Sequence, residues 1–166
     1  MTAGRVERLA HLLRRRGAVL ATAESCTGGL LAAACTSVAG SSDWFERGFV
    51  TYSNDAKTEL LGVSPDAIAT YGAVSREVAL AMAEGALERS RAALAVAVTG
   101  VAGPGGGTAA KPVGTVWIAV AERGRASRAL LLRATGDRTS VREQSVRAAL
   151  DAVIAAAEPS PASPAA

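Results

Sequence analysis

The sequence is poor in the side chains that most often build metal, disulfide and base-stacking sites. It has one histidine, His11, and two cysteines, Cys26 and Cys35, too few for a typical zinc site. The cysteines fall near and along one predicted helix, so we expect two free thiols in a reducing compartment. Aromatic residues make up only 4% of the chain, which argues against a surface that stacks nucleic-acid bases. We expect no metal, no cofactor and no nucleic-acid partner.

Long apolar runs are also missing. No stretch of about 18 apolar residues is present and no secretory signal precedes the first helical pattern, so we expect a cytoplasmic protein with no membrane partner. The 166 residues, 49% apolar with a net charge of +3, suffice for one domain with a sizeable core. Because the arginines are scattered, the positive balance favours small anions at least as much as nucleic acid. We predict one domain over residues 1–157 and a disordered tail rich in Pro, Ala and Ser over 158–166.

Helical and strand patterns alternate along the first two thirds of the chain, and a hairpin pattern follows. A continuous apolar run at 93–98 is typical of a strand buried on both faces, hence of a sheet between two helical layers. The sequence therefore predicts an α/β fold, a three-layer α/β/α sandwich with a mixed, largely parallel sheet. The predicted helices cover residues 3–16, 30–34, a short segment after Asn54 and Asp55, 76–91 capped by Ser75, and 139–157 capped by Ser140 with Glu143; the predicted strands cover 18–21, 49–52, 93–98, 113–121 and 127–132.

The most informative segment is Ala23-Glu24-Ser25-Cys26-Thr27-Gly28-Gly29, between the first strand and the second helix. This arrangement places Ser25 at a helix N-terminus, where free backbone N–H groups can receive an anion or a developing oxyanion. A hydroxyl at that position is a candidate acyl-transfer nucleophile. From the residue alone, Ser25 can equally be a helix N-cap. Cys26 is a second candidate nucleophile, because a helix N-terminus lowers a thiol pKa.

A serine nucleophile needs a base, and the choice is narrow. His11 lies on the N-terminal helix, away from any strand end, so a lysine is the remaining candidate for a Ser-Lys pair. Of the two lysines, Lys57 and Lys111, Lys57 follows a predicted strand and lies near Tyr52. Its amine must be neutral to accept a proton, which requires burial or a nearby cation. Otherwise Lys57 is an ordinary solvated helix lysine.

Glycine-rich and basic segments suggest where an anion would bind. Residues 100–107 form a glycine-rich loop that can cradle a phosphate but lacks the Gly-Lys-Ser/Thr ending of a nucleoside triphosphatase loop. Arg138 and Arg142 lie one turn apart on the last predicted helix and can together hold a phosphate or carboxylate. Because ligands in such sheets bind beyond the carboxyl ends of the strands, we expect the Ser25 segment, the segment before Lys57 and the glycine loop to converge.

Several segments in one order resemble the C-terminal domain of the CinA (competence/damage-inducible) family, in the stand-alone form of the PncC-type nicotinamide mononucleotide deamidases. The resemblance covers about residues 5–157. It rests on residues 23–29, Ala39-Gly40-Ser41-Ser42-Asp43-Trp44-Phe45, Gly48-Phe49-Val50-Thr51-Tyr52-Ser53-Asn54 with Lys57, Gly72-Ala73-Val74-Ser75, Thr99-Gly100-Val101-Ala102-Gly103-Pro104, Lys111-Pro112-Val113-Gly114-Thr115-Val116-Trp117 and Gly136-Asp137-Arg138. The pyrophosphatase domain of larger CinA proteins is not expected here.

The resemblance implies hydrolysis of nicotinamide mononucleotide (NMN) to nicotinate mononucleotide and ammonia, in pyridine nucleotide recycling. It implies a homodimer and a Ser25–Lys57 catalytic pair, and on this basis we expect Tyr52 and Thr99 to assist. The residues expected to bind substrate are Thr27, Gly28, Gly29, Gly100, Gly103, Arg138, Arg142 and Gln144, with the oxyanion on the amides of Thr27, Gly28 and Gly29. Two alternatives stay open: a non-catalytic nucleotide-binding module, and an amidase for another amide.

Overall fold

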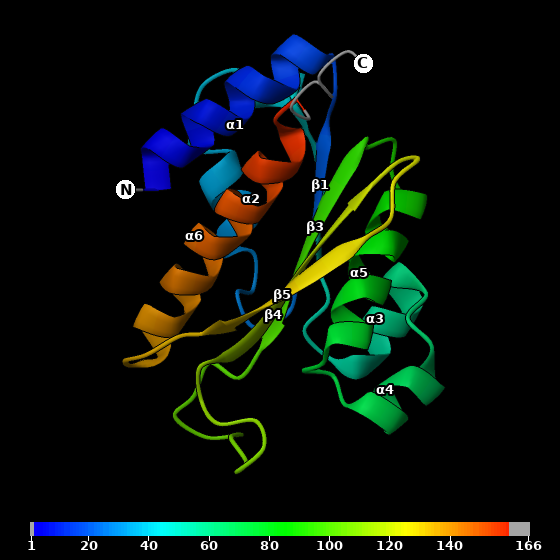
Figure 1. Ribbon diagram of the computed structural model, residues 1–166, viewed down its shortest axis with the longest axis vertical. Helices are drawn as coiled ribbons and strands as arrows, with labels where there is room; N and C mark the ends of the chain where they lie inside the picture. The colour runs from blue at the N-terminus through cyan, green and yellow to red at the C-terminus, as the bar shows by residue number, and fades with distance from the viewer. Residues whose placement is uncertain (1, 160–166) are drawn as a thin grey trace, which may run out of the picture.

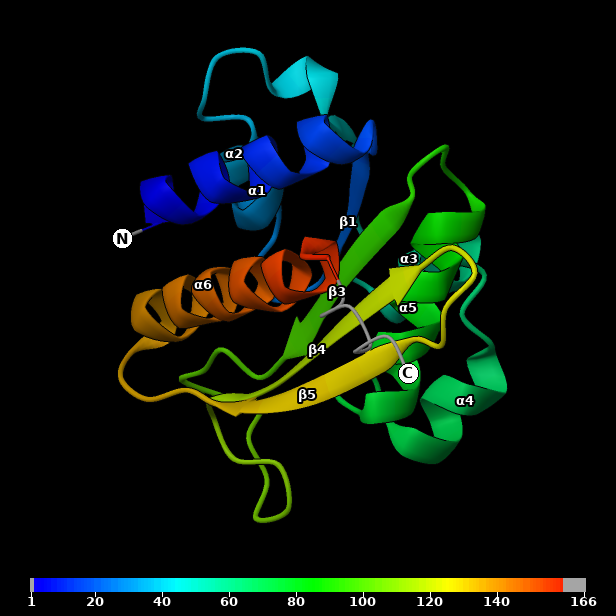
Figure 2. The same cartoon turned by 45° about the horizontal axis from the view of Figure 1, so that its top comes forward.

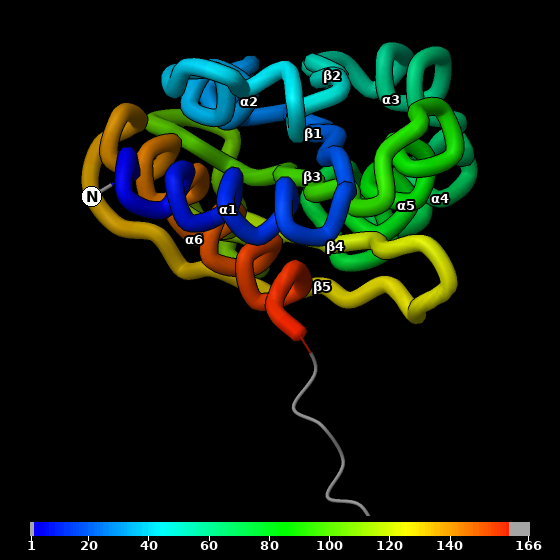
Figure 3. Tube along the Cα trace, turned by 90° about the horizontal axis from the view of Figure 1, so that it is seen from above, coloured from blue at the N-terminus to red at the C-terminus, as the bar shows by residue number. Residues whose placement is uncertain are grey.

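A computed structural model describes residues 2–159 and shows three layers, with a five-stranded sheet between two groups of helices (Figures 1 and 3). The predicted three-layer α/β/α class is thereby confirmed. Residues 160–166 of the predicted tail lie outside the described residues. In chain order the elements are α1 (Thr2–Arg16), β1 (Leu20–Glu24), α2 (Leu30–Cys35), a 3-10 turn η1 (Ser41–Asp43), β2 (Phe45–Val50), α3 (Asn54–Leu61), α4 (Pro65–Tyr71), α5 (Arg76–Glu88), β3 (Leu94–Gly100), β4 (Thr115–Glu122), β5 (Arg128–Arg133) and α6 (Arg138–Ala157).

The sheet has the order β2-β1-β3-β4-β5. Strand β1 runs parallel to both β2 and β3, whereas β4 and β5 continue the sheet as antiparallel strands. The sheet is therefore mixed, as predicted, with two parallel and two antiparallel pairings. The carboxyl ends of β1, β2 and β3 open at the same edge of the sheet, which is where a ligand site is expected.

The two faces of the sheet carry side chains of different size. On β3, Leu94, Val96 and Val98 belong to the core shared with α1, α2 and α6, whereas Ala95 and Ala97 face the core shared with α3 and α5. The run at 93–98 reads as continuously apolar because both faces are buried. Small alanines on the second face let α5 approach the sheet closely, and α1 lies alongside α6 over the first face (Figure 2).

Several predicted elements have different ends in the structure. The first strand is Leu20–Glu24 rather than 18–21, and α5 ends at Glu88 rather than at 91. The second strand occupies Phe45–Val50 rather than 49–52, because its pairing with β1 starts at Phe45 opposite Leu20. Helix α6 begins one residue before the predicted start, and its N-cap is Asp137, whose side chain accepts from the Ser140 amide. Ser140 therefore lies in the first turn as the donor to the cap, and the proposed capping box of Ser140 and Glu143 does not form.

Candidate active site

A cavity of about 320 Å³ opens at the carboxyl ends of the parallel strands. The Ser25 segment, the segment before Lys57 and the glycine-rich loop all line it, so the predicted convergence is confirmed. A fourth segment, before α5, completes the wall. The lining residues are Ser25, Cys26, Tyr52, Asn54, Lys57, Ala73, Val74, Thr99, Gly100, Val101, Ala102, Gly103, Gly105, Gly106 and Arg138.

The amine of Lys57 lies within hydrogen-bond distance of the Ser25 hydroxyl. The Lys57 Nζ atom lies 3.2 Å from Ser25 Oγ, and the side chain is only 1% exposed. Ser53 caps α3 by accepting from the Ala56 amide, which sets the helix start one turn before Lys57. The carbonyl oxygens of residues 51, 52 and 53 also accept hydrogen bonds from Nζ. The lysine is thus held at one place, between the last residues before α3 and the serine.

Burial lowers the pKa of Lys57 below its ordinary value of 10.5, since a charged amine loses its water shell there. The shift raises the fraction of neutral amine near neutral pH, which is the form that can accept a proton. A buried lysine within hydrogen-bond distance of a hydroxyl is the arrangement of a nucleophile with its base.

Cys26 is buried and faces the same cavity, but its chemistry differs. Burial raises the pKa of the Cys26 thiol to about 11. The prediction that Ser25 and Cys26 lie at the helix N-terminus is wrong, because α2 begins at Leu30 with Gly29 as its N-cap. The expected lowering by a helix end is therefore missing, and the sulfur stays protonated at neutral pH. Since the thiolate is the nucleophilic form, Ser25 is the better placed nucleophile of the two.

The turn that carries Ser25, residues 25–29 (hereafter the serine turn), is anchored on three sides. The Ser25 amide donates to Val98 O at 2.9 Å, and the Gly28 amide donates to Ser25 O at 3.0 Å. Buried Glu24 accepts hydrogen bonds from the amides of Gly29, Leu31 and Ala32, so its carboxylate caps the N-terminus of α2.

This geometry changes the expected oxyanion site. The amides of Gly28 and Gly29 already have acceptors, so the prediction that they receive the oxyanion is not supported. Within residues 2–159 the Thr27 amide donates to no acceptor, and the Cys26 amide has only its own sulfur. The Cys26 and Thr27 amides are therefore the unpaired ones of the turn, but only Cys26 lines the cavity, whereas Thr27 is fully buried.

Positive charge and backbone groups dominate the cavity wall. Lys57 and Arg138 are the charged side chains that line it within the described residues. Arg138 donates to Gly103 O at 2.8 Å and to the Tyr52 hydroxyl at 2.9 Å, which joins the glycine loop to the segment after β2. Thr99 donates its hydroxyl to Ala73 O at 2.8 Å, so it fixes the loop before α5 rather than pointing a free hydroxyl at Lys57.

Other predicted binding residues lie outside the cavity. Gln144 of α6 exchanges hydrogen bonds with the backbone of Thr135, which precedes that helix. Arg142 donates to the Thr27 carbonyl at 2.9 Å. Thr27, Gly28 and Gly29 form the serine turn but do not line the cavity. Helical spacing placed Arg138 and Arg142 on one face, but only the first residue of α6 reaches the cavity.

Sequence reasoning missed Glu24 and Asn54. Glu24 stands directly before Ser25 at the end of a buried strand, and a carboxylate facing a helix N-terminus is the signal that would have identified it. Asn54 begins α3 and was interpreted only as a cap, a role that Ser53 performs.

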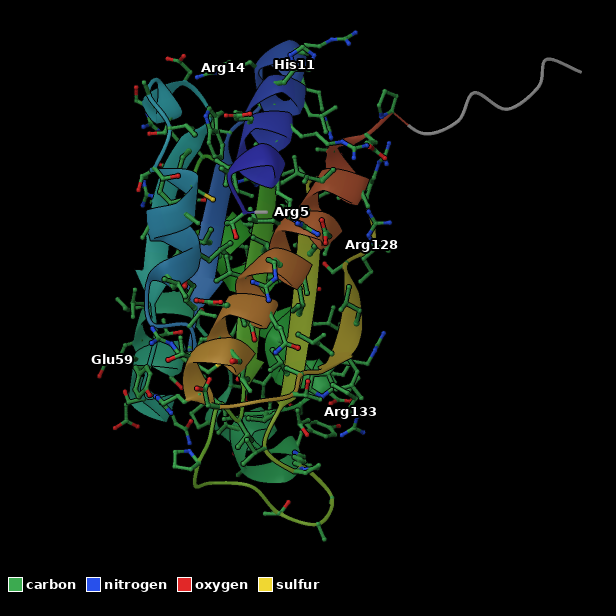
Figure 4. All side chains as sticks on the ribbon, turned by 90° about the vertical axis from the view of Figure 1, so that its left-hand side faces the viewer. Arg5, His11, Arg14, Glu59, Arg128 and Arg133 are labelled. Atoms are coloured by element: carbon green, nitrogen blue, oxygen red, sulfur yellow. The ribbon has the colours of Figure 1, made fainter. Side chains whose placement is uncertain are left out.

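His11 has no part in this site. It is exposed on α1, and Figure 4 shows it near the top of the molecule, well above Glu59 of α3, the helix that carries Lys57. Among residues 2–159 there is no group of three or more His, Cys, Asp or Glu side chains that could hold a metal ion. No helix in that part of the chain is long and apolar enough to cross a membrane.

Comparison with known proteins agrees with these features. The CinA C-terminal domain family matches residues 3–157. The chain belongs to this family. It is 50% identical over 144 residues to the nicotinamide-nucleotide amidohydrolase PncC of Escherichia coli K12, covering 87% of each chain. It is also 57% identical over 136 residues to a CinA-like protein of Geobacter sp. M21, covering 82% of this chain and 33% of that one.

Solved structures of the CinA family show the same fold. The competence/damage-inducible protein CihA of Agrobacterium tumefaciens superposes with a TM-score of 0.92 at 50% identity, covering 95% of this chain and 96% of that one. A CinA superfamily protein of Escherichia coli gives a TM-score of 0.89 at 37% identity, covering 93% and 89%. Both likenesses span nearly the whole domain, so the carboxyl-end cavity lies within the shared fold.

Proposed function

We propose that the protein is an amidohydrolase that converts nicotinamide mononucleotide to nicotinate mononucleotide and ammonia, with Ser25 as nucleophile and Lys57 as its base. The observation that carries the proposal is the 3.2 Å contact between Lys57 Nζ and Ser25 Oγ inside the cavity. The name of the PncC relative, 50% identical over most of the chain, supports the substrate.

The proposed reaction runs through an acyl-enzyme. Neutral Lys57 takes the proton of the Ser25 hydroxyl while the oxygen attacks the carboxamide carbon. The Cys26 amide, which lines the cavity, donates to the oxyanion that forms. Protonated Lys57 then returns its proton to the leaving nitrogen and ammonia departs. Lys57 next takes a proton from water, whose oxygen attacks the acyl carbon, so that nicotinate mononucleotide leaves and the Ser25 hydroxyl is restored.

The substrate phosphate is proposed to bind at Arg138 and the glycine loop. Within residues 2–159 the amides of Ala102, Gly103, Gly105 and Gly106 donate no hydrogen bond, and no carboxylate lines the cavity. An arginine beside free backbone amides suits a phosphate. The role in pyridine nucleotide recycling, the cytoplasmic location and the homodimer stay predictions from the family resemblance.

The test is release of ammonia and nicotinate mononucleotide from nicotinamide mononucleotide by the wild type and by Ser25→Ala and Lys57→Met. We expect both variants to lose at least about 1,000-fold in kcat. Ser37→Ala, on an exposed serine at the end of α2, and Lys111→Met, outside the cavity, are the matched controls and should keep turnover.

Each other outcome has a definite meaning. Turnover retained in Ser25→Ala would move the nucleophile to Cys26 or to water. A folded wild type that binds nicotinamide mononucleotide without turnover would favour a nucleotide-binding module. A wild type that neither binds nor turns it over, but hydrolyses another carboxamide, would favour an amidase with a different substrate.

A further inference from the structure

The Arg142 side chain contacts the serine turn. It lies on α6, is half-buried, and does not line the cavity. Its Nη2 atom donates to the Thr27 carbonyl at 2.9 Å, across 115 residues of sequence. The same carbonyl accepts from the Leu30 amide at 3.1 Å. The side chain thus contacts the turn and not the space where a substrate would lie.

The hydrogen bonds of the turn divide its peptides into two groups. The Thr27–Gly28 peptide is fixed at both ends, by Arg142 at its oxygen and by Ser25 O at its N–H. The Gly29 amide is fixed by Glu24. Between Ser25 and this anchored part lie the amides of Cys26 and Thr27, which are the free pair. Their direction is set by the anchored peptides on either side.

A carboxylate, that of Glu24, and a guanidinium, that of Arg142, both anchor the serine turn. Buried Glu24 accepts three amides at the start of α2, and Arg142 donates to a carbonyl from α6. The Arg142 Nε atom is itself buried with no hydrogen-bond partner within the described residues. A buried donor without an acceptor is unfavourable. The Arg142 side chain therefore holds the Thr27 carbonyl while its own Nε donor stays unsatisfied within residues 2–159.

We propose that Arg142 is a positioning residue, which holds the Cys26 amide in the direction that the oxyanion requires by fixing the Thr27 carbonyl. The kinetic part of this proposal rests on the proposed amidase function. Preorganised donors stabilise a transition state without reorganising during the reaction. A turn that loses an anchor lets the Cys26 amide rotate, which raises the barrier of the chemical step but leaves the substrate contacts in place.

The variants are Arg142→Met, which keeps the apolar stem and removes the donor, and Arg142→Lys, which keeps a charged donor. We expect Arg142→Met to lower kcat on the order of 100-fold with KM for nicotinamide mononucleotide unchanged. Arg142→Lys should recover part of that loss. Arg147→Met is the matched control, because Arg147 lies on the same helix and pairs with Glu143 instead of the turn.

A second readout does not depend on activity. Hydrogen–deuterium exchange should become faster in the peptide covering residues 25–31 of Arg142→Met, while exchange in the strands stays that of the wild type. If the wild type proves inactive on nicotinamide mononucleotide, the proposed function fails, but this exchange measurement still decides whether Arg142 orders the turn.

Three results would overturn the proposal. A raised KM with unchanged kcat would mean that Arg142 contacts the substrate, as the sequence first suggested. Unchanged kcat and KM would remove any role in the reaction. A fall in kcat with unchanged exchange at residues 25–31 would mean that Arg142 acts by a route other than ordering the turn.

Discussion

At the scale of single residues, burial decides the chemistry of the site. Lys57 and Cys26 are both buried beside Ser25, and in each case burial favours the neutral form. For the lysine, the neutral form is the active base. For the cysteine, the neutral form is the inactive thiol. Burial therefore favours the proposed pair of Ser25 with Lys57 over Cys26.

The titration of Lys57 should be visible in protein stability. Its pKa is lower in the folded state than the 10.5 of an ordinary lysine, so between these two values the unfolded state binds more protons. The free energy of unfolding of the wild type should then rise with pH across that window. Lys57→Met lacks this contribution, so the wild type should gain stability relative to the variant as pH increases towards 10.5.

Chemical denaturation at a series of pH values from neutral upward measures this difference. Lys111→Met serves as the control and should run parallel to the wild type, because it removes a lysine that donates to Tyr71 O outside the cavity. Parallel curves for the wild type and Lys57→Met would show that Lys57 keeps an ordinary pKa. The proposed base would then be charged at neutral pH.

Arg138 should affect binding rather than chemistry. We expect Arg138→Ala to raise KM for nicotinamide mononucleotide by about tenfold or more, since a charged hydrogen bond to the phosphate is lost. The corresponding nucleoside, which has no phosphate, should bind the variant and the wild type equally well. Arg128→Ala, exposed on β5, is the control. Equal effects of Arg138→Ala on nucleotide and nucleoside would place the phosphate elsewhere.

At the scale of secondary-structure elements, short local signals set where each helix begins. Ser75 caps α5 by accepting from the Val78 amide, and its hydroxyl also donates to Gly72 O. This cap was predicted from the sequence, because a serine before a helical pattern is a local signal. The Asp137 cap was missed, since Ser140 with Glu143 offered a competing pattern three residues later.

Removing the Ser75 cap should weaken the fold locally. Ser75→Ala should lower the free energy of unfolding by about 1 kcal/mol, because the first turn of α5 loses its acceptor. The loop that ends in Ser75 contributes Ala73 and Val74 to the cavity, so KM should rise as well. Urea denaturation and steady-state kinetics check both effects, with Ser37→Ala as the control. A variant as stable as the wild type would mean that water replaces the cap.

At the scale of the whole molecule, close approach of the layers brings the site together. Gly85 of α5 meets α3 so closely that a Cβ atom there would lie 1.9 Å from the Leu61 carbonyl oxygen. The glycine therefore sets the distance between α5 and α3, the helix that presents Lys57. A bulkier residue must displace backbone rather than a flexible side chain.

Gly85→Ala should accordingly lower the free energy of unfolding by at least about 2 kcal/mol through overpacking. Turnover should fall as well, because a shift of α3 moves Lys57 away from Ser25. Gly4→Ala in α1, where a Cβ atom meets nothing within 4 Å, is the matched control and should stabilise by about 0.5 kcal/mol. Thermal unfolding and kinetics of both variants test this. Equal stabilities would show that α5 and α3 can separate without cost.

The sequence by itself determined the features that depend on neighbouring residues. The buried apolar strand predicted at 93–98, the serine turn, the helix cap at Ser75 and the late hairpin all follow from local composition, because turns and caps satisfy backbone groups within a few residues. The identity of Ser25 and Lys57 as candidates also came from the chain, by scarcity of other bases and by family resemblance.

Only the tertiary structure decided which groups remain free to act. Lys57 meets Ser25 across 32 residues and Arg142 meets Thr27 across 115. Contacts with Val98 and Glu24 give the Ser25 and Gly29 amides internal acceptors, whereas the Cys26 amide lies on a residue that lines the cavity. Helical spacing could not separate Arg138 from Arg142, nor could the glycine pattern show that the Gly28 and Gly29 amides were occupied. Such outcomes depend on how the layers pack, because a hydrogen-bond partner distant in sequence is fixed only when the chain has folded around it.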